Sequence, residues 1–244
     1  MSLASLAVVV ALSASSADPG AAPDPHALLA RYDAVMSPAF FEVDARMIAH
    51  RADGTTRGYK MHVQKAGADK LRASFLEPAT AKGQEMLRNG DNLWLYMPNL
   101  KRAVRVAARD QFMGGDFNNA DVLRPNYEAD YDGTITPDPA HADAVLLTLK
   151  AKGPQVAYDV VKLWMTSGKD AQPVRMEAYA SSGKLLRSAE FTEVKDVGKG
   201  WRRPTKLVMK NELQPARFST LSWDAGAVKD AVPASRFVVD DLGR

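Results

Sequence analysis

Residues 75–121 read FLEPATAKGQEMLRNGDNLWLYMPNLKRAVRVAARDQFMGGDFNNAD, and the fold is decided by this stretch. Two strand-like runs, Gln84–Arg88 and Asn92–Met97, flank an Asn-Gly-Asp turn. An Asn-Gly pair adopts the positive φ angles that match the twist of two paired strands. In the second run, side chains of different character alternate. Its aliphatic face consists of Leu93, Leu95 and Met97. The pattern predicts an antiparallel hairpin.

The second half of this stretch predicts a third strand and a compact loop. Arg102–Val106 forms the strand, and the segment FMGGDF follows it. We expect Phe112, Met113 and Phe117 to anchor this loop as a lid, because they are large and apolar and surround two flexible glycines. A short helix through Leu123 then begins, with Asp116 or Asn118 as its capping residue.

The rest of the chain alternates strand-like runs with turn residues. Helical spacing from His26, ended by Pro38, predicts one helix before the first strand. The predicted strands outside the central stretch are 40–50, 57–65, 71–75, 126–135, 144–150, 158–166, 174–180, 184–190, 201–210 and 217–223. About a dozen short strands indicate a mainly β, antiparallel barrel or sandwich, and the absence of a linker predicts one domain over 26–244.

Composition restricts the partners. The chain has 244 residues, of which 46% are hydrophobic and 25% charged, and a net charge of +3 with no dense basic tract. This predicts an ordinary globular core and no nucleic-acid partner. The sequence contains no cysteine, so it offers neither a disulfide nor a thiol for lipid anchoring.

The N-terminus predicts export. Residues 1–17, MSLASLAVVVALSASSA, contain an apolar run too short to span a bilayer and end in a small-x-small cleavage pattern. We expect a signal peptide at 1–17, a disordered lead-in at 18–25 and a soluble periplasmic protein. A buried helix at 1–17 is the alternative, because the usual basic residue near the start is missing.

No enzymatic motif stands out. The four histidines are far apart, and nucleophile elbows, phosphate loops and dinucleotide fingerprints are absent from the sequence. We therefore expect no catalytic residues, no metal site, no cofactor and no enzyme. Glu77, Asp91, Asp116 and Asp121 are acidic residues of the central stretch that leave a carboxylate pair open, and an uncharacterised hydrolase using Asp91, Asp116 or Asp121 is a distant alternative. Turn, cap and pre-proline roles suit them better.

Five short motifs of the central stretch resemble the outer-membrane lipoprotein-sorting protein family, the relatives of the periplasmic lipoprotein carrier. The motifs are Phe75-x-x-Pro78, Lys82-Gly83, Asp91-x-Leu93-Trp94-Leu95-Tyr96-x-Pro98, Arg102-x-x-Arg105 and Phe112-Met113-Gly114-Gly115-Asp116-Phe117. Gly115 departs from the family, which more often has serine there. The resemblance implies a strongly curved antiparallel sheet, an incomplete barrel, with a few helices covering its open side above an apolar cavity.

The apolar sides of the predicted strands supply the candidate cavity. We expect these sides to form one concave surface, because neighbouring strands must bury the same face. The candidate residues are Tyr59, Met61, Val63, Phe75, Leu93, Leu95, Met97, Leu163, Met165 and Met176. Methionine is common in any core, but it also repacks around variable apolar guests.

Two functions fit this expectation. The first is a periplasmic carrier that shields the acyl chains of a lipoprotein or another lipid during outer-membrane lipoprotein sorting, as a lipid-binding chaperone. The second is an envelope-stress sensory or interaction module of the same fold that binds a lipidated ligand. For the carrier we expect a monomer that receives its cargo from an inner-membrane transporter.

Overall fold

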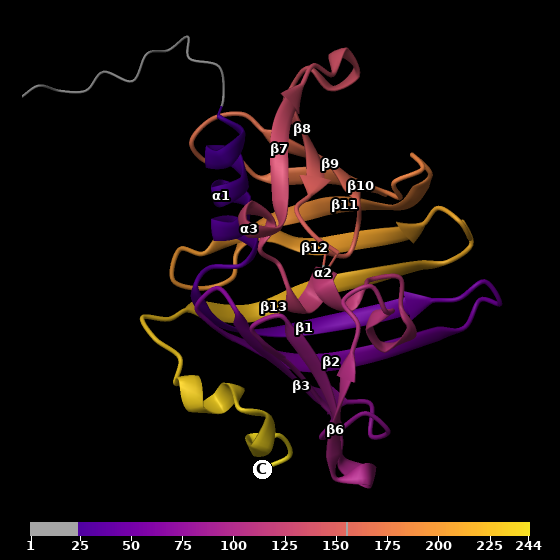
Figure 1. Cartoon of the computed structure of the whole chain (residues 1–244), viewed down its shortest axis with the longest axis vertical. Coiled ribbons are helices and arrows are strands. Elements are labelled where there is room, and N and C mark those ends of the chain that lie inside the picture. Colours follow the sequence, from indigo (N-terminus) through magenta and orange to yellow (C-terminus); the bar gives the residue numbers. More distant parts are fainter. Residues whose placement is uncertain (1–23, 155) are drawn as a thin grey trace, which may run out of the picture.

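The computed structural model describes residues 24–154 and 156–244, and it shows one curved antiparallel sheet with short helices on one side (Figure 1). The α-helices of these residues are α1 Pro25–Met36, α2 Asn119–Leu123 and α3 Tyr127–Asp130. The strands are β1 Phe40–His50, β2 Thr56–Ala66, β3 Lys70–Glu77, β4 Glu85–Asn89, β5 Asn92–Met97, β6 Arg102–Val106, β7 Tyr131–Thr136, β8 Ala144–Ala151, β9 Val160–Thr166, β10 Pro173–Tyr179, β11 Leu185–Asp196, β12 Arg202–Asn211 and β13 Phe218–Val228. Short 3-10 turns are η1 Pro98–Leu100, η2 Phe112–Gly114, η3 Pro139–His141, η4 Ala234–Phe237 and η5 Val239–Asp241.

The order of the strands explains why helices cover one side of the sheet. The 13 strands are arranged β6-β5-β4-β3-β2-β1-β13-β12-β11-β10-β9-β8-β7. The chain therefore meanders outward from β1 to one edge at β6, and later returns from the other edge at β7 to β13. Residues 107–130, which include α2 and α3, must run from one edge to the other across the open side. The predicted mainly β fold, an incomplete barrel partly covered by helices, is confirmed.

Helix α1 begins and ends where the sequence predicts. The Asp24 side chain accepts hydrogen bonds from two backbone N–H groups of the first turn, and Pro25 is the first helical residue. The helix ends before Pro38. The predicted signal peptide and residues 18–23 of the predicted lead-in lie outside the described residues. Among the described residues, no helix is long and apolar enough to cross a lipid bilayer.

One predicted strand is wrong in its first half. The run 126–135 begins with helix α3, and β7 starts at Tyr131. The cause lies in α1, because the carboxylate of Asp33 accepts the backbone N–H groups of Tyr127 and Glu128 at 2.9 Å each. This carboxylate caps the first turn of α3 from a distance of 94 residues in sequence, so a local pattern does not reveal it.

Alternate residues of each strand point to the two faces of the sheet. On β1 the odd-numbered residues from Phe41 to Ala49 are buried on the concave face, whereas Glu42 and Arg46 point outward. The concave face and the three helices form the main hydrophobic core. In Figure 1 the helices lie in front of this face, with α1 over the β7 side of the sheet.

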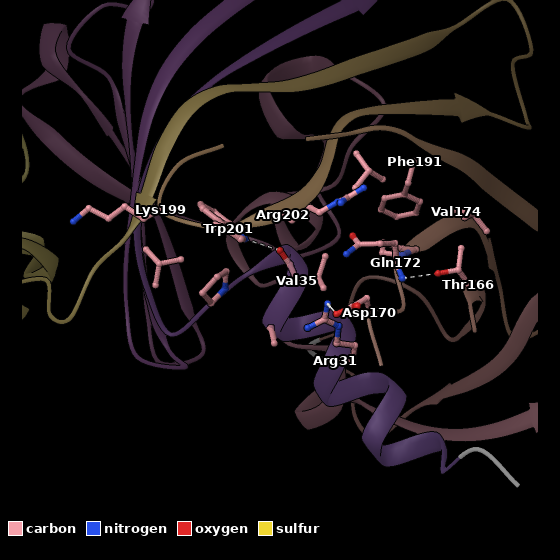
Figure 2. A pocket seen from close by; sticks show the side chains of 16 residues that line it. Arg31, Val35, Thr166, Asp170, Gln172, Val174, Phe191, Lys199, Trp201 and Arg202 are labelled. Atoms are coloured by element: carbon pink, nitrogen blue, oxygen red, sulfur yellow. Dashed lines mark hydrogen bonds and ion pairs between the residues drawn. The ribbon is translucent and has the colours of Figure 1, made fainter. Parts of the chain in front are cut away.

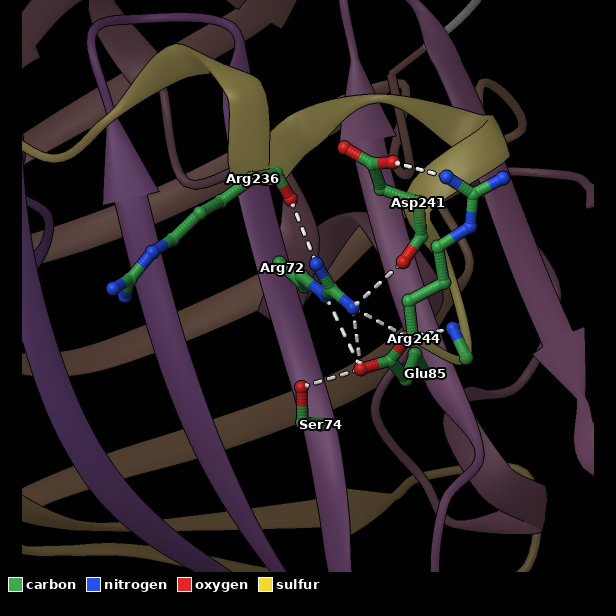
Figure 3. A network of polar contacts seen from close by, with 7 residues as sticks. Arg72, Ser74, Glu85, Arg236, Asp241 and Arg244 are labelled. Atoms are coloured by element: carbon green, nitrogen blue, oxygen red, sulfur yellow. Dashed lines mark hydrogen bonds and ion pairs between the residues drawn. The ribbon is translucent and has the colours of Figure 1, made fainter.

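The C-terminal segment covers part of the outer face. Phe237 and Leu242 pack with Leu87 of β4 in a second, smaller apolar cluster. Figure 3 shows the polar contacts that hold this segment: the Arg72 side chain donates to the Arg236 carbonyl at 3.0 Å and pairs with Glu85 at 2.7 Å. The segment is thus fixed on the outside of the half-barrel, away from the helices.

Candidate functional site

A small cavity lies between the concave face and the helix layer. Its volume is about 60 Å³. The lining residues come from α1, α2, the α2–α3 connection and five strands near the middle of the sheet: Tyr32, Met36, Phe41, Ala45, Met61, Val63, Leu71, Asp121, Val122, Pro125, Arg203, Leu207, Leu221 and Trp223. Most of them are apolar, so the cavity offers an apolar guest a favourable surface.

The strand register places all ten candidate cavity residues on the concave face. Met61 and Val63 line the cavity. The other buried members fill the core around it: Tyr59, Phe75, Leu93, Leu163, Met165 and Met176. Leu95 and Met97 are partly exposed near the β6 edge. Contact of these residues with a ligand stays a prediction.

The predicted lid loop plugs one end of the half-barrel. Phe112 and Phe117 are fully buried, and the Phe112 ring lies 5.9 Å from that of Phe75. Met113 is partly buried, and its carbonyl accepts a hydrogen bond from the Tyr59 hydroxyl at 3.3 Å. These three residues pack as apolar anchors, and their action as a lid stays a prediction.

Asp116 fixes this loop to the sheet. Its carboxylate is 1% exposed and accepts hydrogen bonds from Ser219 at 2.9 Å and Asn211 at 3.2 Å. Gly115 lies against the same strands, since a Cβ there would come within 3.2 Å of the Ser219 hydroxyl and 3.3 Å of Met47. The loop therefore comes close to the sheet at position 115, which suits the glycine that stands here where the family more often has serine.

Arg203 is the important residue of the site that the sequence analysis missed. It is 1% exposed on β12 and lines the cavity. Its guanidinium stacks over the ring of Trp223 at 4.0 Å and that of Trp201 at 5.0 Å. Within the described residues it forms no ion pair with a carboxylate. Burial lowers the pKa of Arg203 to about 9, so the group carries a desolvated positive charge at neutral pH.

Two side chains of the sheet, Lys65 and Arg203, and that of Trp201 just before β12 hold the end of α1. Trp201 Nε1 donates to the carbonyl of Val35 at 2.8 Å, and Arg203 Nη1 donates to the carbonyl of Met36 at 2.8 Å. Lys65 Nζ donates to the carbonyl and the hydroxyl of Ser37, both at 2.7 Å. These bonds satisfy three successive carbonyls that a helix end leaves without intrahelical partners.

Two acidic groups of the helix layer are also perturbed. Burial raises the pKa of Asp121, which lines the cavity, to about 6, although bonds from Asn118 N–H and the Tyr158 hydroxyl oppose this. Burial likewise raises the pKa of Asp33 to about 6. Both carboxylates hold short helices in place and are part of the cover over the cavity.

The remaining polar candidates lie away from the cavity. Arg102 and Arg105 are exposed on the edge strand β6. Asp91 lies in the β4–β5 turn and pairs with Arg124 at 2.6 Å. Glu77, before Pro78, lies 4.0 Å from Arg46 on the outer face. Among residues 24–154 and 156–244, no group of three or more histidine, aspartate or glutamate side chains is arranged to hold a metal ion.

A curved open sheet with a helix cover and an apolar interior defines the class of half-barrel binding folds, and solved structures identify it further. A LolA superfamily protein from Nitrosomonas europaea is 25% identical, with a TM-score of 0.80 over 91% of this chain and 100% of that chain. A DUF1329 family protein from Desulfovibrio piger is 20% identical, with a TM-score of 0.75 over 89% and 97% of the two chains. An outer membrane lipoprotein-sorting protein domain from Vibrio parahaemolyticus is 21% identical, with a TM-score of 0.72 over 88% and 94%.

A family model described as uncharacterized protein-like matches residues 67–244, and the chain belongs to that family. No curated protein sequence matches the chain. The structural neighbours confirm the resemblance to the lipoprotein-sorting proteins at the level of the fold: the chain has the LolA-type fold.

Proposed function

We propose that this protein binds the acyl chains of a lipid or a lipoprotein between the concave face of the sheet and helix α1, and carries them through the periplasm. The observation that carries this proposal is the apolar cavity beneath a helix whose last turn is bonded to the sheet by three side chains. An acyl chain needs such shielding, because each methylene moved into water costs roughly 0.8 kcal/mol.

In this proposal the described structure is a closed form. Its cavity of about 60 Å³ is far smaller than the roughly 300–1,000 Å³ of ordinary ligand pockets. An acyl chain therefore enters as α1 moves away from β12 and β13. Tyr32 and Met36 are the α1 side chains that leave the cavity wall in this movement.

Arg203 makes this movement less costly. In the closed form its charge is buried without a carboxylate partner, and opening returns the guanidinium to water. The bond to the Met36 carbonyl is lost at the same time, but water replaces it. Apolar packing then favours closure and hydration of a charge favours opening, which suits a carrier that must both load and release.

The cellular setting follows from the same proposal. A carrier of this kind is an exported periplasmic monomer that acts as a lipid chaperone in lipoprotein transport. It takes cargo from an inner-membrane transporter and performs no catalysis.

Native mass spectrometry of the exported protein, purified without detergent, tests this function. We expect peaks heavier than the polypeptide by the mass of a lipid or an acylated peptide, which disappear after organic extraction. The extracted protein should then bind the neutral apolar dye N-phenyl-1-naphthylamine, and a long-chain fatty acid should displace it. A lipid-free protein that binds neither dye nor fatty acid contradicts the proposal.

A further inference from the structure

A wide groove lies next to the closed cavity, at the end of α1 (Figure 2). It has a volume of about 890 Å³ and lies between α1, the start of β10 and the connection from β11 to β12. Apolar walls are formed by Phe191, Val174 and Val228. The groove is thus open to solvent, large enough for a ligand, and polar on some sides and apolar on others.

Positive charge predominates in this groove. Arg31, Lys199 and Arg202 line it, against one carboxylate, that of Asp170. Arg31 is held in place, because its Nε donates to the Ala171 carbonyl at 3.3 Å, while its Nη2 lies 3.9 Å from Asp170. Arg202 and Lys199 make no ion pair with any described residue. The groove therefore has an excess of two positive charges, which favours an anion.

A buried amide points to a ligand more specifically. Gln172 lines the groove and is 9% exposed, yet its side-chain oxygen has no hydrogen-bond partner among the described residues. Figure 2 draws the Gln172 side chain between those of Arg31 and Arg202. Buried amides are normally satisfied, so a ligand hydroxyl that donates a hydrogen bond to this oxygen relieves an unfavourable state.

Trp201 separates the groove from the cavity. Trp201 lines the groove. Its ring also lies 5.0 Å from the guanidinium of Arg203 and 5.0 Å from the ring of Phe41, and both of these residues line the cavity. Val35, whose carbonyl accepts from Trp201, also lines the groove. In the proposed opening movement, lifting the end of α1 joins the groove and the cavity into one continuous space.

We propose that this groove binds the phosphate of an anionic phospholipid headgroup whose acyl chains occupy the adjacent cavity. Arg31 and Arg202 are the phosphate ligands, because planar guanidinium groups bind phosphate oxygens in pairs of hydrogen bonds. Gln172 binds a further polar group of the headgroup or its glycerol. This assignment rests on the proposed binding of acyl chains and adds the class of lipid.

Displacement of N-phenyl-1-naphthylamine by three short lipids with identical chains tests the assignment: dihexanoyl phosphatidylglycerol, dihexanoyl phosphatidylcholine and dihexanoylglycerol. We expect the anionic lipid to displace the dye at a concentration at least about tenfold lower than dihexanoylglycerol, with the zwitterionic lipid between them. The double variant Arg31→Gln/Arg202→Gln should reduce this preference to less than about threefold and leave displacement by dihexanoylglycerol unchanged. The matched control is Arg102→Gln/Arg105→Gln, on the exposed edge strand, which should retain the preference.

Three results would overturn the assignment. These are equal displacement by the anionic lipid and dihexanoylglycerol in the parent, a preference that survives in the double variant, or a preference lost equally in the control. Inorganic phosphate, measured by calorimetry, should bind more weakly than the anionic lipid, and equal affinity would assign the groove to free phosphate instead. If none of the three lipids displaces the dye, acyl binding itself is contradicted, which separates the two proposals.

The single variant Gln172→Leu should weaken binding of the anionic lipid while the melting temperature stays within a few degrees of the parent's. An unchanged affinity for this lipid also contradicts the assignment.

Discussion

Replacing Arg203 by methionine should stabilise the closed form and slow the uptake of apolar ligands. The fall in the pKa of this group from 12.5 to about 9 corresponds to roughly 5 kcal/mol of unfavourable desolvation, which the variant removes. Against this, the Met36 and Pro204 carbonyls lose their donor, at about 1–3 kcal/mol each, and the stacking on Trp223 and Trp201 is lost, at about 0.5–2 kcal/mol. The expected net effect is a stabilisation of up to about 2 kcal/mol, in line with apolar replacement of other buried charges.

Thermal melting and stopped-flow dye binding measure the two consequences. Each kcal/mol raises the melting temperature of a chain of this size by about 2–4 °C. Uptake of N-phenyl-1-naphthylamine should be at least about fivefold slower, because opening no longer returns a charge to water. The variant Arg102→Met, at an exposed position, should change neither quantity. If Arg203→Met melts several degrees lower and takes up dye as fast as the parent, the guanidinium stabilises the closed form, and the reasoning is refuted.

Three further predictions concern the cavity, its acidic wall and the lid loop. Ala45→Leu adds three carbons to the cavity wall and should weaken fatty-acid binding at least about tenfold while the melting temperature holds or rises. The control Ala73→Leu, in the filled core, should instead lower the free energy of unfolding by about 1–3 kcal/mol. Similar effects of both variants would contradict the placement of the cavity. Because burial raises the pKa of both Asp121 and Asp33 to about 6, their charged forms destabilise the fold above that pH, so the melting temperature should rise between pH 7 and 5 by the equivalent of about 1–3 kcal/mol. When parent and variant melts are compared across pH, Asp121→Asn should reduce this rise by the share of Asp121 and leave the share of Asp33. Asp116→Ala leaves Ser219 and Asn211 without their acceptor and should lower stability in urea titrations by about 2–4 kcal/mol. The control Asp53→Ala, at a fully exposed position, should lower stability much less, and equal losses would show that the loop is not anchored there.

The sheet could be predicted from the sequence because its signals are local. The Asn89-Gly90 turn and the alternation of Leu93 and Leu95 fix strand positions within a few residues, and β1, β5 and β6 have the predicted boundaries. Helix α3 was not predictable in this way, because the carboxylate that caps it belongs to α1.

The candidate site could be predicted in part. Alternation identifies which side of each strand is buried, and the ten candidate residues do share the concave face. It does not reveal which part of that face stays unfilled, since this depends on where α1 and α2 rest. The burial of Arg203 was not predicted either, because an arginine between Arg202 and Pro204 in a strand is normally a surface residue. A signal was present in the alternation itself, which places Arg203 on the same side as Thr205 and Leu207.

Tryptophan quenching by a brominated fatty acid tests most directly whether acyl chains enter beneath α1. Trp223 lines the cavity, whereas Trp94 packs in the outer cluster with Arg105 over its ring. Bromine quenches tryptophan fluorescence at contact distance, so 9,10-dibromostearic acid should quench the parent protein and Trp94→Phe to the same extent. The largest share of this quenching should disappear in Trp223→Phe. Quenching that is unchanged in Trp223→Phe, or that is lost in Trp94→Phe, would place the acyl chain outside the half-barrel and contradict the proposed function.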